Sequence, residues 1–160
     1  MYEEKVTVYY GSGKGKTAAA LGYAIQSASQ GHSVIIVQFL KGRKEEELVF
    51  LRRLEPDIKV FSFARSVKDF SELSEEEQQE ESMNIRNGFN FAKKVLITGE
   101  CNLLILDGFL DLLNNGMVSE EDFQILMNAK SEDTEILLTG RRMREILQKY
   151  AEKIYEICAG

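Results

Sequence analysis

A glycine-rich segment near the N-terminus constrains the fold of this chain more than any other part of its sequence. It lies between an apolar run at residues 5–10 and an alanine-rich run at residues 17–24, and it consists of Gly11, Ser12, Gly13, Lys14, Gly15, Lys16 and Thr17. The first run is typical of a strand and the second of the beginning of a helix. A glycine turn between strand and helix lets backbone N–H groups and the positive end of the helix dipole converge on an anion. We therefore predict that these residues bind a polyphosphate.

The spacing of this motif is shorter than usual. The common phosphate loop reads Gly-x-x-x-x-Gly-Lys-Ser/Thr, which requires a glycine where Tyr10 stands in this chain. In such loops the lysine neutralises phosphate charge and the hydroxyl holds Mg²⁺, roles that fall here on Lys16 and Thr17. The shortened loop points to one branch of the phosphate-loop proteins.

Composition and charge limit the classes of partner. The chain has 160 residues, 44% hydrophobic and 29% charged, which is typical of one soluble globular domain spanning residues 1–160. Its net charge of −6 argues against a nucleic-acid partner, because such binding depends on cations that neutralise phosphates. No apolar run approaches the length of a membrane span, so we expect no membrane partner and a cytoplasmic location. Cys101 and Cys158 are too few and too far apart for a metal site or a disulfide framework, and we expect them to be buried thiols.

Apolar segments alternate with helical patterns along the whole chain. After the first strand and helix, we predict strands at residues 34–39, 58–63, 103–107, 135–140 and 154–158. Helices are predicted within 43–54, from a capping box at Ser74 and Glu77 to a stop at Gly99, from Ser119 to about 129, and over 142–150. Residues 64–73 are expected to form a mobile loop. This order predicts an α/β fold with a mostly parallel central sheet of five to six strands.

Further charged residues follow strands of the predicted sheet. Asp107 ends a buried apolar strand, Lys41 follows the second strand and Arg141 follows the fifth. Because ligands of a parallel sheet bind outside the carboxyl ends of its strands, these side chains are expected near the glycine-rich loop. An acid in this position commonly holds Mg²⁺ in nucleotide-binding proteins, and the cations would offset the charge of an ATP tail. The combination predicts a site for a magnesium nucleotide.

The sequence resembles the ATP:corrinoid adenosyltransferases of the P-loop type, also called cob(I)alamin adenosyltransferases. The resemblance begins with the shortened loop followed by Ala-Ala-x-Gly and covers most of the chain. It continues at Gln38-Phe39-Leu40-Lys41-Gly42, Leu104-Ile105-Leu106-Asp107, the helix begun by Ser119, and Leu138-Thr139-Gly140-Arg141. It implies a P-loop NTPase-like three-layer fold.

The resemblance also implies a reaction. In that family a reduced Co(I) corrinoid attacks the ribose C5′ of ATP, and inorganic triphosphate leaves. Carried over by position, residues 11–17 would bind the triphosphate together with Lys41 and Arg141. Thr17 and Asp107 would lie around Mg²⁺, and Lys16 and Asp107 would be the catalytic residues. The small-molecule partners would be ATP and a corrinoid, and members commonly form homodimers.

The chain departs from the family pattern in the half of the site that would face the corrinoid. Gly108 stands where the family has a glutamate, and Gln26 where an arginine is common. The aromatic loop that the family has after its third strand is not evident in residues 64–70, and the family's C-terminal segment does not follow residue 160. Two alternatives therefore stay open: a catalytically impaired ATP-binding relative that serves as a binding or regulatory module, and a small P-loop kinase or hydrolase.

Overall fold

The computed structural model describes residues 5–39, 49–63 and 70–158. Its strands form one six-stranded sheet in the order β3-β2-β4-β5-β1-β6, and all neighbouring strands pair in parallel. The strands are β1 (Val6–Tyr10), β2 (Val34–Gln38), β3 (Ile58–Ser62), β4 (Leu103–Asp107), β5 (Glu135–Gly140) and β6 (Lys153–Glu156). The α-helices are α1 (Lys16–Ser29), α3 (Glu75–Thr98), α4 (Phe109–Asn114), α5 (Glu120–Ala129) and α6 (Glu145–Gln148), with short 3-10 turns η1 (Arg52–Leu54) and η2 (Phe70–Glu72).

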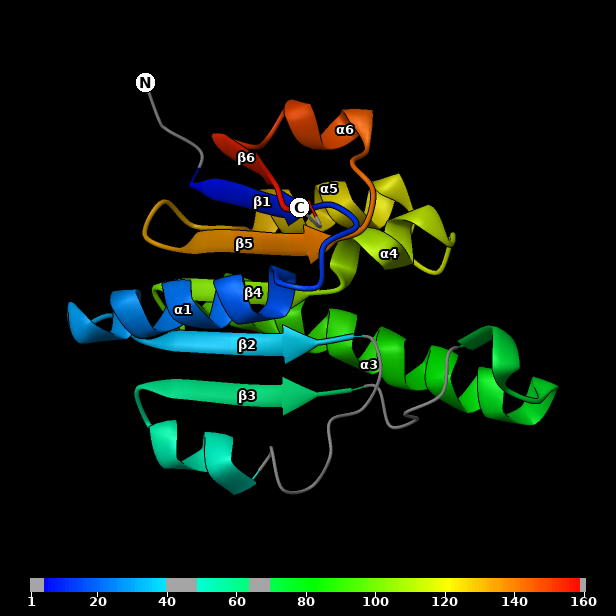
Figure 1. Cartoon of the computed structure of the whole chain (residues 1–160), viewed down its shortest axis with the longest axis horizontal. Helices are drawn as coiled ribbons and strands as arrows, with labels where there is room; N and C mark the ends of the chain where they lie inside the picture. Colours follow the sequence, from blue (N-terminus) through cyan, green and yellow to red (C-terminus); the bar gives the residue numbers. More distant parts are fainter. Residues whose placement is uncertain (1–4, 40–48, 64–69, 159–160) are drawn as a thin grey trace.

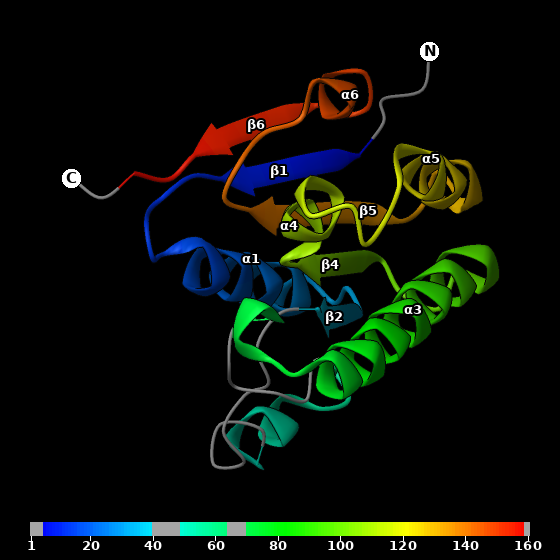
Figure 2. The same ribbon diagram turned by 90° about the vertical axis from the view of Figure 1, so that its right-hand side faces the viewer.

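Helices cover both faces of the sheet, giving three layers (Figures 1 and 2). Helix α1 packs on one face over a cluster that includes Ala24, Ile36 and Ile105. Helices α3, α4 and α5 pack on the other face over a larger cluster that includes Phe89 and Phe123. The central strands β2 and β4 are buried along most of their length, which explains their nearly unbroken apolar sequences. The α/β, P-loop NTPase-like three-layer prediction is confirmed, and the sheet is wholly parallel.

Local sequence signals placed several element ends correctly. Helix α3 begins with the predicted capping box of Ser74 and Glu77 and ends at Gly99, which has the left-handed φ of 65°. Helix α5 begins after Ser119 as predicted and ends at Ala129. Side-chain and backbone signals near helix ends are local, so they could be interpreted without the tertiary structure.

Some predictions of elements were wrong. Helix α4 was not predicted, and the helix predicted over residues 142–150 is reduced to α6, because residue 144 has an extended backbone. Cys101 is buried, and burial raises the pKa of its thiol to about 11, but Cys158 is exposed. The helix within 43–54 and the loop over 64–73 lie partly outside the described residues. In the part of the chain that the structure describes, no helix has the length and apolar character needed to cross a bilayer.

Candidate functional site

The glycine-rich loop connects β1 to α1 and is held by hydrogen bonds from both of its sides. The Gly11 N–H donates to the carbonyl of Gly140 at the end of β5, at 3.1 Å, and the Gly13 N–H donates to the carbonyl of Ile157 after β6, at 3.0 Å. On the inner side, the Lys16 ammonium donates to the carbonyls of Gly11 and Gly13 at 2.6 and 2.8 Å. The loop is therefore curled around its own lysine and leads directly into the N-terminus of α1, where backbone N–H groups lack helical partners.

Asp107, the last residue of β4, lies beside the start of α1. The Thr17 hydroxyl donates to its carboxylate, at 3.1 Å from Oδ2. The Thr139 hydroxyl from β5 donates to Oδ1 at 2.6 Å and in turn accepts the Gly108 N–H at 2.8 Å. Two hydroxyl groups from different elements thus fix the half-buried carboxylate next to the loop.

A row of polar side chains crosses the sheet at the level of Asp107, near the carboxyl ends of the strands. In each of four neighbouring strands, the residue two positions before the polar residue belongs to the apolar cluster under α1 or packs against it. Because side chains alternate along a strand, the residues at the strand ends face α1 as well. They are Ser62 in β3, Gln38 in β2, Asp107 in β4 and Thr139 in β5. A cavity of about 10 Å³ lies between Gln38, Asp107 and Thr17, which is room for about one water molecule.

A larger cavity lies farther from the loop, at the β3 edge of the sheet. It has a volume of about 370 Å³ and is lined by residues of η1, β3 and α3, among them Phe61, Ser62 and Asn84. Ser62 lines this cavity and pairs in register with Gln38, which pairs with Asp107. The row of polar residues therefore connects the loop region with this cavity.

The chain reverses sharply after Asp107. Gly108 is buried, has a φ of 83°, and precedes α4 as its N-terminal cap residue. From α4, the Asp111 carboxylate accepts the backbone N–H of Arg141 at 3.0 Å. The left-handed φ explains why a glycine suits this position.

The structure brings most of the predicted site residues together. Residues 11–17 and Asp107 form one continuous group, and Arg141 follows β5 at the same edge with an exposed side chain. Lys41 lies outside the described residues. The sequence-based prediction missed Thr139 and Ile157 as parts of this group. A hydroxyl that directly follows an apolar stretch near the end of a strand was a usable signal for Thr139, whereas Ile157 gave no signal.

Comparison with known proteins identifies the family of this chain. The sequence model described as ATP:corrinoid adenosyltransferase BtuR/CobO/CobP matches residues 3–159. The chain belongs to this adenosyltransferase family. The predicted resemblance is confirmed over nearly the whole chain.

Individual relatives are distant. The chain is 23% identical to the corrinoid adenosyltransferase of Escherichia coli K12 over 95% of this chain and 75% of that protein. It is 24% identical to the corrinoid adenosyltransferase CobA of Salmonella typhimurium, with the same coverage. It is 28% identical to the uncharacterized protein all2391 of Nostoc over 85% of this chain, but the match spans only 38% of that protein.

Among solved structures, the flagellar accessory protein FlaH of Methanocaldococcus jannaschii superposes with a TM-score of 0.63. The superposition covers 98% of this chain and 72% of FlaH, at 14% sequence identity. This similarity supports the fold and adds nothing on the reaction of the adenosyltransferase family.

Proposed function

We propose that this member of the family binds Mg²⁺-ATP at the glycine-rich loop and transfers the 5′-deoxyadenosyl group to a reduced Co(I) corrinoid, releasing triphosphate. The observation that carries the proposal is the hydrogen bond between Thr17 and Asp107 beside a loop curled around Lys16. It joins the two parts of a magnesium-nucleotide site that are 90 residues apart in the sequence. Family membership supports the choice of reaction.

In this proposal the loop supplies positive charge to the triphosphate. The Lys16 ammonium and the N–H groups at the start of α1 bind phosphate oxygens, and exposed Arg141 adds a second cation at the same edge. We assign Lys41 to the same task from its place in the sequence alone. The reaction forms a cobalt–carbon bond at C5′ and breaks the bond from C5′ to oxygen, whose electron pair leaves on triphosphate. Neutralising that leaving group is the main contribution of these residues to the rate.

The oxygen atoms of Thr17 and Asp107 fit Mg²⁺ shared with phosphates. Mg²⁺ is commonly bound through one or two carboxylates together with substrate phosphates and water. Among the described residues, no cluster of three or more acidic, histidine or cysteine side chains could hold a metal alone. We therefore propose that Asp107 and Thr17 hold the ion only together with ATP, where it neutralises phosphate charge.

A second candidate function rests on Gly108. If the family glutamate at this position is needed to align C5′ with cobalt, this chain would bind ATP and transfer its adenosyl group slowly or not at all. It would then act as a nucleotide-binding module. A kinase or hydrolase would need a base or water-positioning acid near the γ-phosphate. Asp107 already accepts hydrogen bonds from two hydroxyl groups, so it is poorly placed to act as that base or water-positioning acid.

One assay separates these functions. The protein is incubated with ATP, Mg²⁺ and chemically reduced cobalamin while the corrinoid absorption spectrum is followed. Conversion to the adenosylated spectrum with release of triphosphate supports the transferase. ATP binding without conversion supports the module, and release of phosphate or ADP supports a kinase or hydrolase.

Asp107→Asn is expected to reduce the stabilisation that Mg²⁺-ATP gives to the protein. The amide keeps one acceptor oxygen for a hydroxyl, so the loss of stability without ligand should be about 1 kcal/mol or less. A tenfold weaker site lowers the ligand-induced stabilisation by about 1.4 kcal/mol, which is roughly 3–5 °C in melting temperature. Thermal melting with and without Mg²⁺-ATP measures both quantities.

Asp133→Asn is the matched control, because Asp133 is exposed and lies in the turn before β5, at the opposite end of that strand from Thr139. Mg²⁺-ATP should stabilise this variant as much as it stabilises the parent protein. If Mg²⁺-ATP raised the melting temperature of Asp107→Asn and of the parent equally, Asp107 would not be part of the metal site.

Gly108→Glu tests whether the missing carboxylate limits transfer. The left-handed φ of 83° should cost a side chain roughly 1–2 kcal/mol of stability. Gly108→Ala carries the same backbone cost without a carboxylate, so it is the matched control. Under the second candidate function, the parent transfers slowly and Gly108→Glu transfers at a rate at least tenfold above that of Gly108→Ala, since small misalignments of reacting atoms cost about 100-fold. Fast transfer by the parent, or equal rates for the two variants, would show that no carboxylate is needed here.

A further inference from the structure

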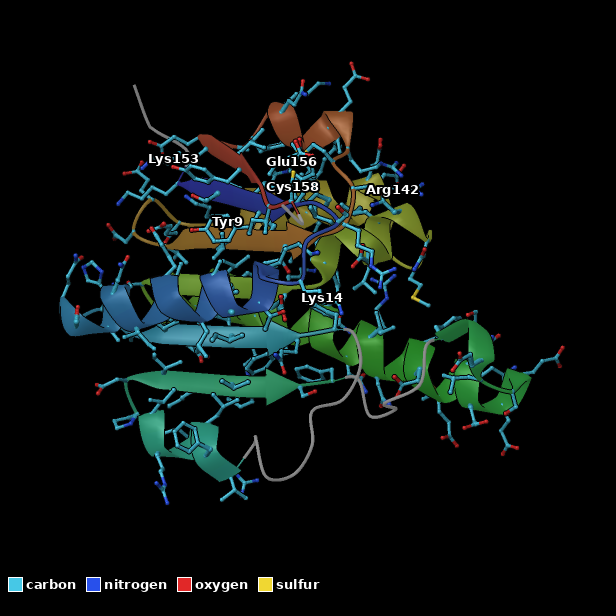
Figure 3. The ribbon with its side chains drawn as sticks, viewed as in Figure 1. Tyr9, Lys14, Arg142, Lys153, Glu156 and Cys158 are labelled. Carbon is cyan, nitrogen blue, oxygen red and sulfur yellow. The ribbon has the colours of Figure 1, made fainter. Side chains whose placement is uncertain are left out.

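Residues 157 and 158, which follow β6, lie directly against the glycine-rich loop. The Ile157 N–H donates to the carbonyl of Tyr10 at 2.7 Å, and the Ile157 carbonyl accepts the Gly13 N–H at 3.0 Å. Ile157 therefore contacts the last residue of β1 through its N–H group and the third residue of the loop through its carbonyl group. In Figure 3, Glu156 and Cys158, its neighbours, lie where β6 ends, on the side of the molecule where β1 leads into the loop.

The glycines of the loop leave room for this contact. A Cβ atom on Gly11, whose φ is 135°, would overlap the Ile157 carbonyl oxygen. A Cβ on Gly13 would lie 2.9 Å from the same oxygen, and one on Gly15 would lie 3.8 Å from Ile157 Cγ2. The absence of side chains at Gly11 and Gly13 thus lets Ile157 approach the loop closely, whereas a Cβ on Gly15 would be in ordinary van der Waals contact with Ile157.

The contact complements the one that Lys16 makes from the inner side. Lys16 holds the carbonyls of Gly11 and Gly13, while Gly140 and Ile157 hold the N–H groups of the same two residues. The N–H and carbonyl groups of Gly11 and Gly13 are thus held from both sides, and the N–H groups of residues 14–17 follow toward the helix N-terminus. The loop is one residue shorter than usual. It therefore has one residue fewer with which to hold its own backbone in this curved shape.

We propose that Ile157 is a positioning residue for the phosphate-binding loop, so that docking of the segment after β6 and binding of triphosphate groups favour each other. This inference rests on the proposed nucleotide site. A loop that is already ordered loses less conformational freedom when it binds an anion. Coupling of this kind is reciprocal: ATP should stabilise the docked segment as much as the docked segment strengthens ATP binding.

The test compares three substitutions in the full chain. Ile157→Gly removes the side chain and loosens the docked backbone, whereas Ile157→Val keeps the γ-methyl group that faces the loop. Ile154→Gly is the matched control, because it replaces isoleucine by glycine at a β6 residue that is 39% exposed. Calorimetry gives the Kd for ATP and for inorganic tripolyphosphate, and melting without ligand checks the fold. Hydrogen exchange at the Gly13 amide reports on the contact itself.

We expect Ile157→Gly to bind both ligands about tenfold more weakly and to exchange the Gly13 amide faster. Ile157→Val and Ile154→Gly should stay within about twofold of the parent. Ile157→Pro, which also deletes the N–H donated to Tyr10, should weaken binding at least as much as the glycine variant. In the parent, ATP should slow exchange of the Ile157 amide.

Three results would overturn the inference. Tighter binding by Ile157→Gly would mean that the Ile157 carbonyl competes with phosphate for the Gly13 N–H. Unchanged affinity in both the glycine and proline variants would mean that the loop needs no support from this segment. A parent that binds ATP but transfers no adenosyl group would end the transferase proposal alone, whereas a parent that binds neither ligand would end both.

Discussion

We expect Lys16→Ala to weaken ATP binding by about 10- to 100-fold. The ammonium lies inside the curled loop, where a charge-assisted hydrogen bond to a phosphate contributes roughly 1.5–3 kcal/mol, and each 1.4 kcal/mol is a factor of ten in Kd. Its bonds to the carbonyls of Gly11 and Gly13 are lost as well, so the loop loses its inner support. Calorimetric titration of the folded variant with ATP measures the change.

The matched control for this prediction is Lys153→Ala. It removes the same charge from an exposed position on β6, which Figure 3 shows away from Lys14 and the loop. Its Kd for ATP should stay within about twofold of the parent value, because exposed charges at a distance are largely screened. An unchanged Kd in Lys16→Ala would exclude the loop as the phosphate site.

We expect Gly140→Ala to lower the stability of the protein by about 1–3 kcal/mol, or roughly 3–10 °C in melting temperature. A Cβ at this position would overlap the Cβ of Leu110 and lie 3.1 Å from the Leu110 Cα. Helix α4 packs here directly against the end of β5, so the added methyl group must displace backbone as well as a side chain. Because Gly140 also accepts the Gly11 N–H, ATP affinity should fall together with stability.

Gly22→Ala is the same substitution in a different environment. Gly22 lies in the interior of α1, is exposed, and has nothing within 4 Å of an added Cβ. Alanine should therefore raise stability by about 0.5–1 kcal/mol, since glycine is a poor helix former. Thermal melting of both variants should show opposite signs. Similar effects in the two would mean that the contact between α4 and β5 is not close-packed.

The sequence predicted those features that depend on neighbouring residues. The loop between β1 and α1, the capping boxes at Ser74 and Ser119 and the end of α3 at Gly99 were all evident from short patterns. The position of Asp107 beside Thr17 was also predictable, because the carboxyl ends of parallel strands lie along one edge.

Other features depend on the order of the strands in the sheet. Thr139 contacts Asp107 because β5 lies next to β4, and Ile157 reaches the loop because β6 pairs with β1. No local pattern specifies these neighbours, since they are set by packing across the whole molecule. Helix α4 was missed for a related reason: its six residues depend on burial against β5 more than on their own helical pattern.

The strand order also has a consequence for the time at which the site can form during synthesis. Within the described structure, β1 pairs with β5 and β6, whose residues begin at position 135. Chains are synthesised from the N-terminus, and pairings between distant segments form slowly because the intervening loop must close first. Residues 11–17 therefore leave the ribosome early but obtain their supporting partners, Gly140 and Ile157, only after more than 120 further residues have been made. Nascent chains stalled before position 135 should lack any affinity for triphosphate, although they already carry the complete glycine-rich motif.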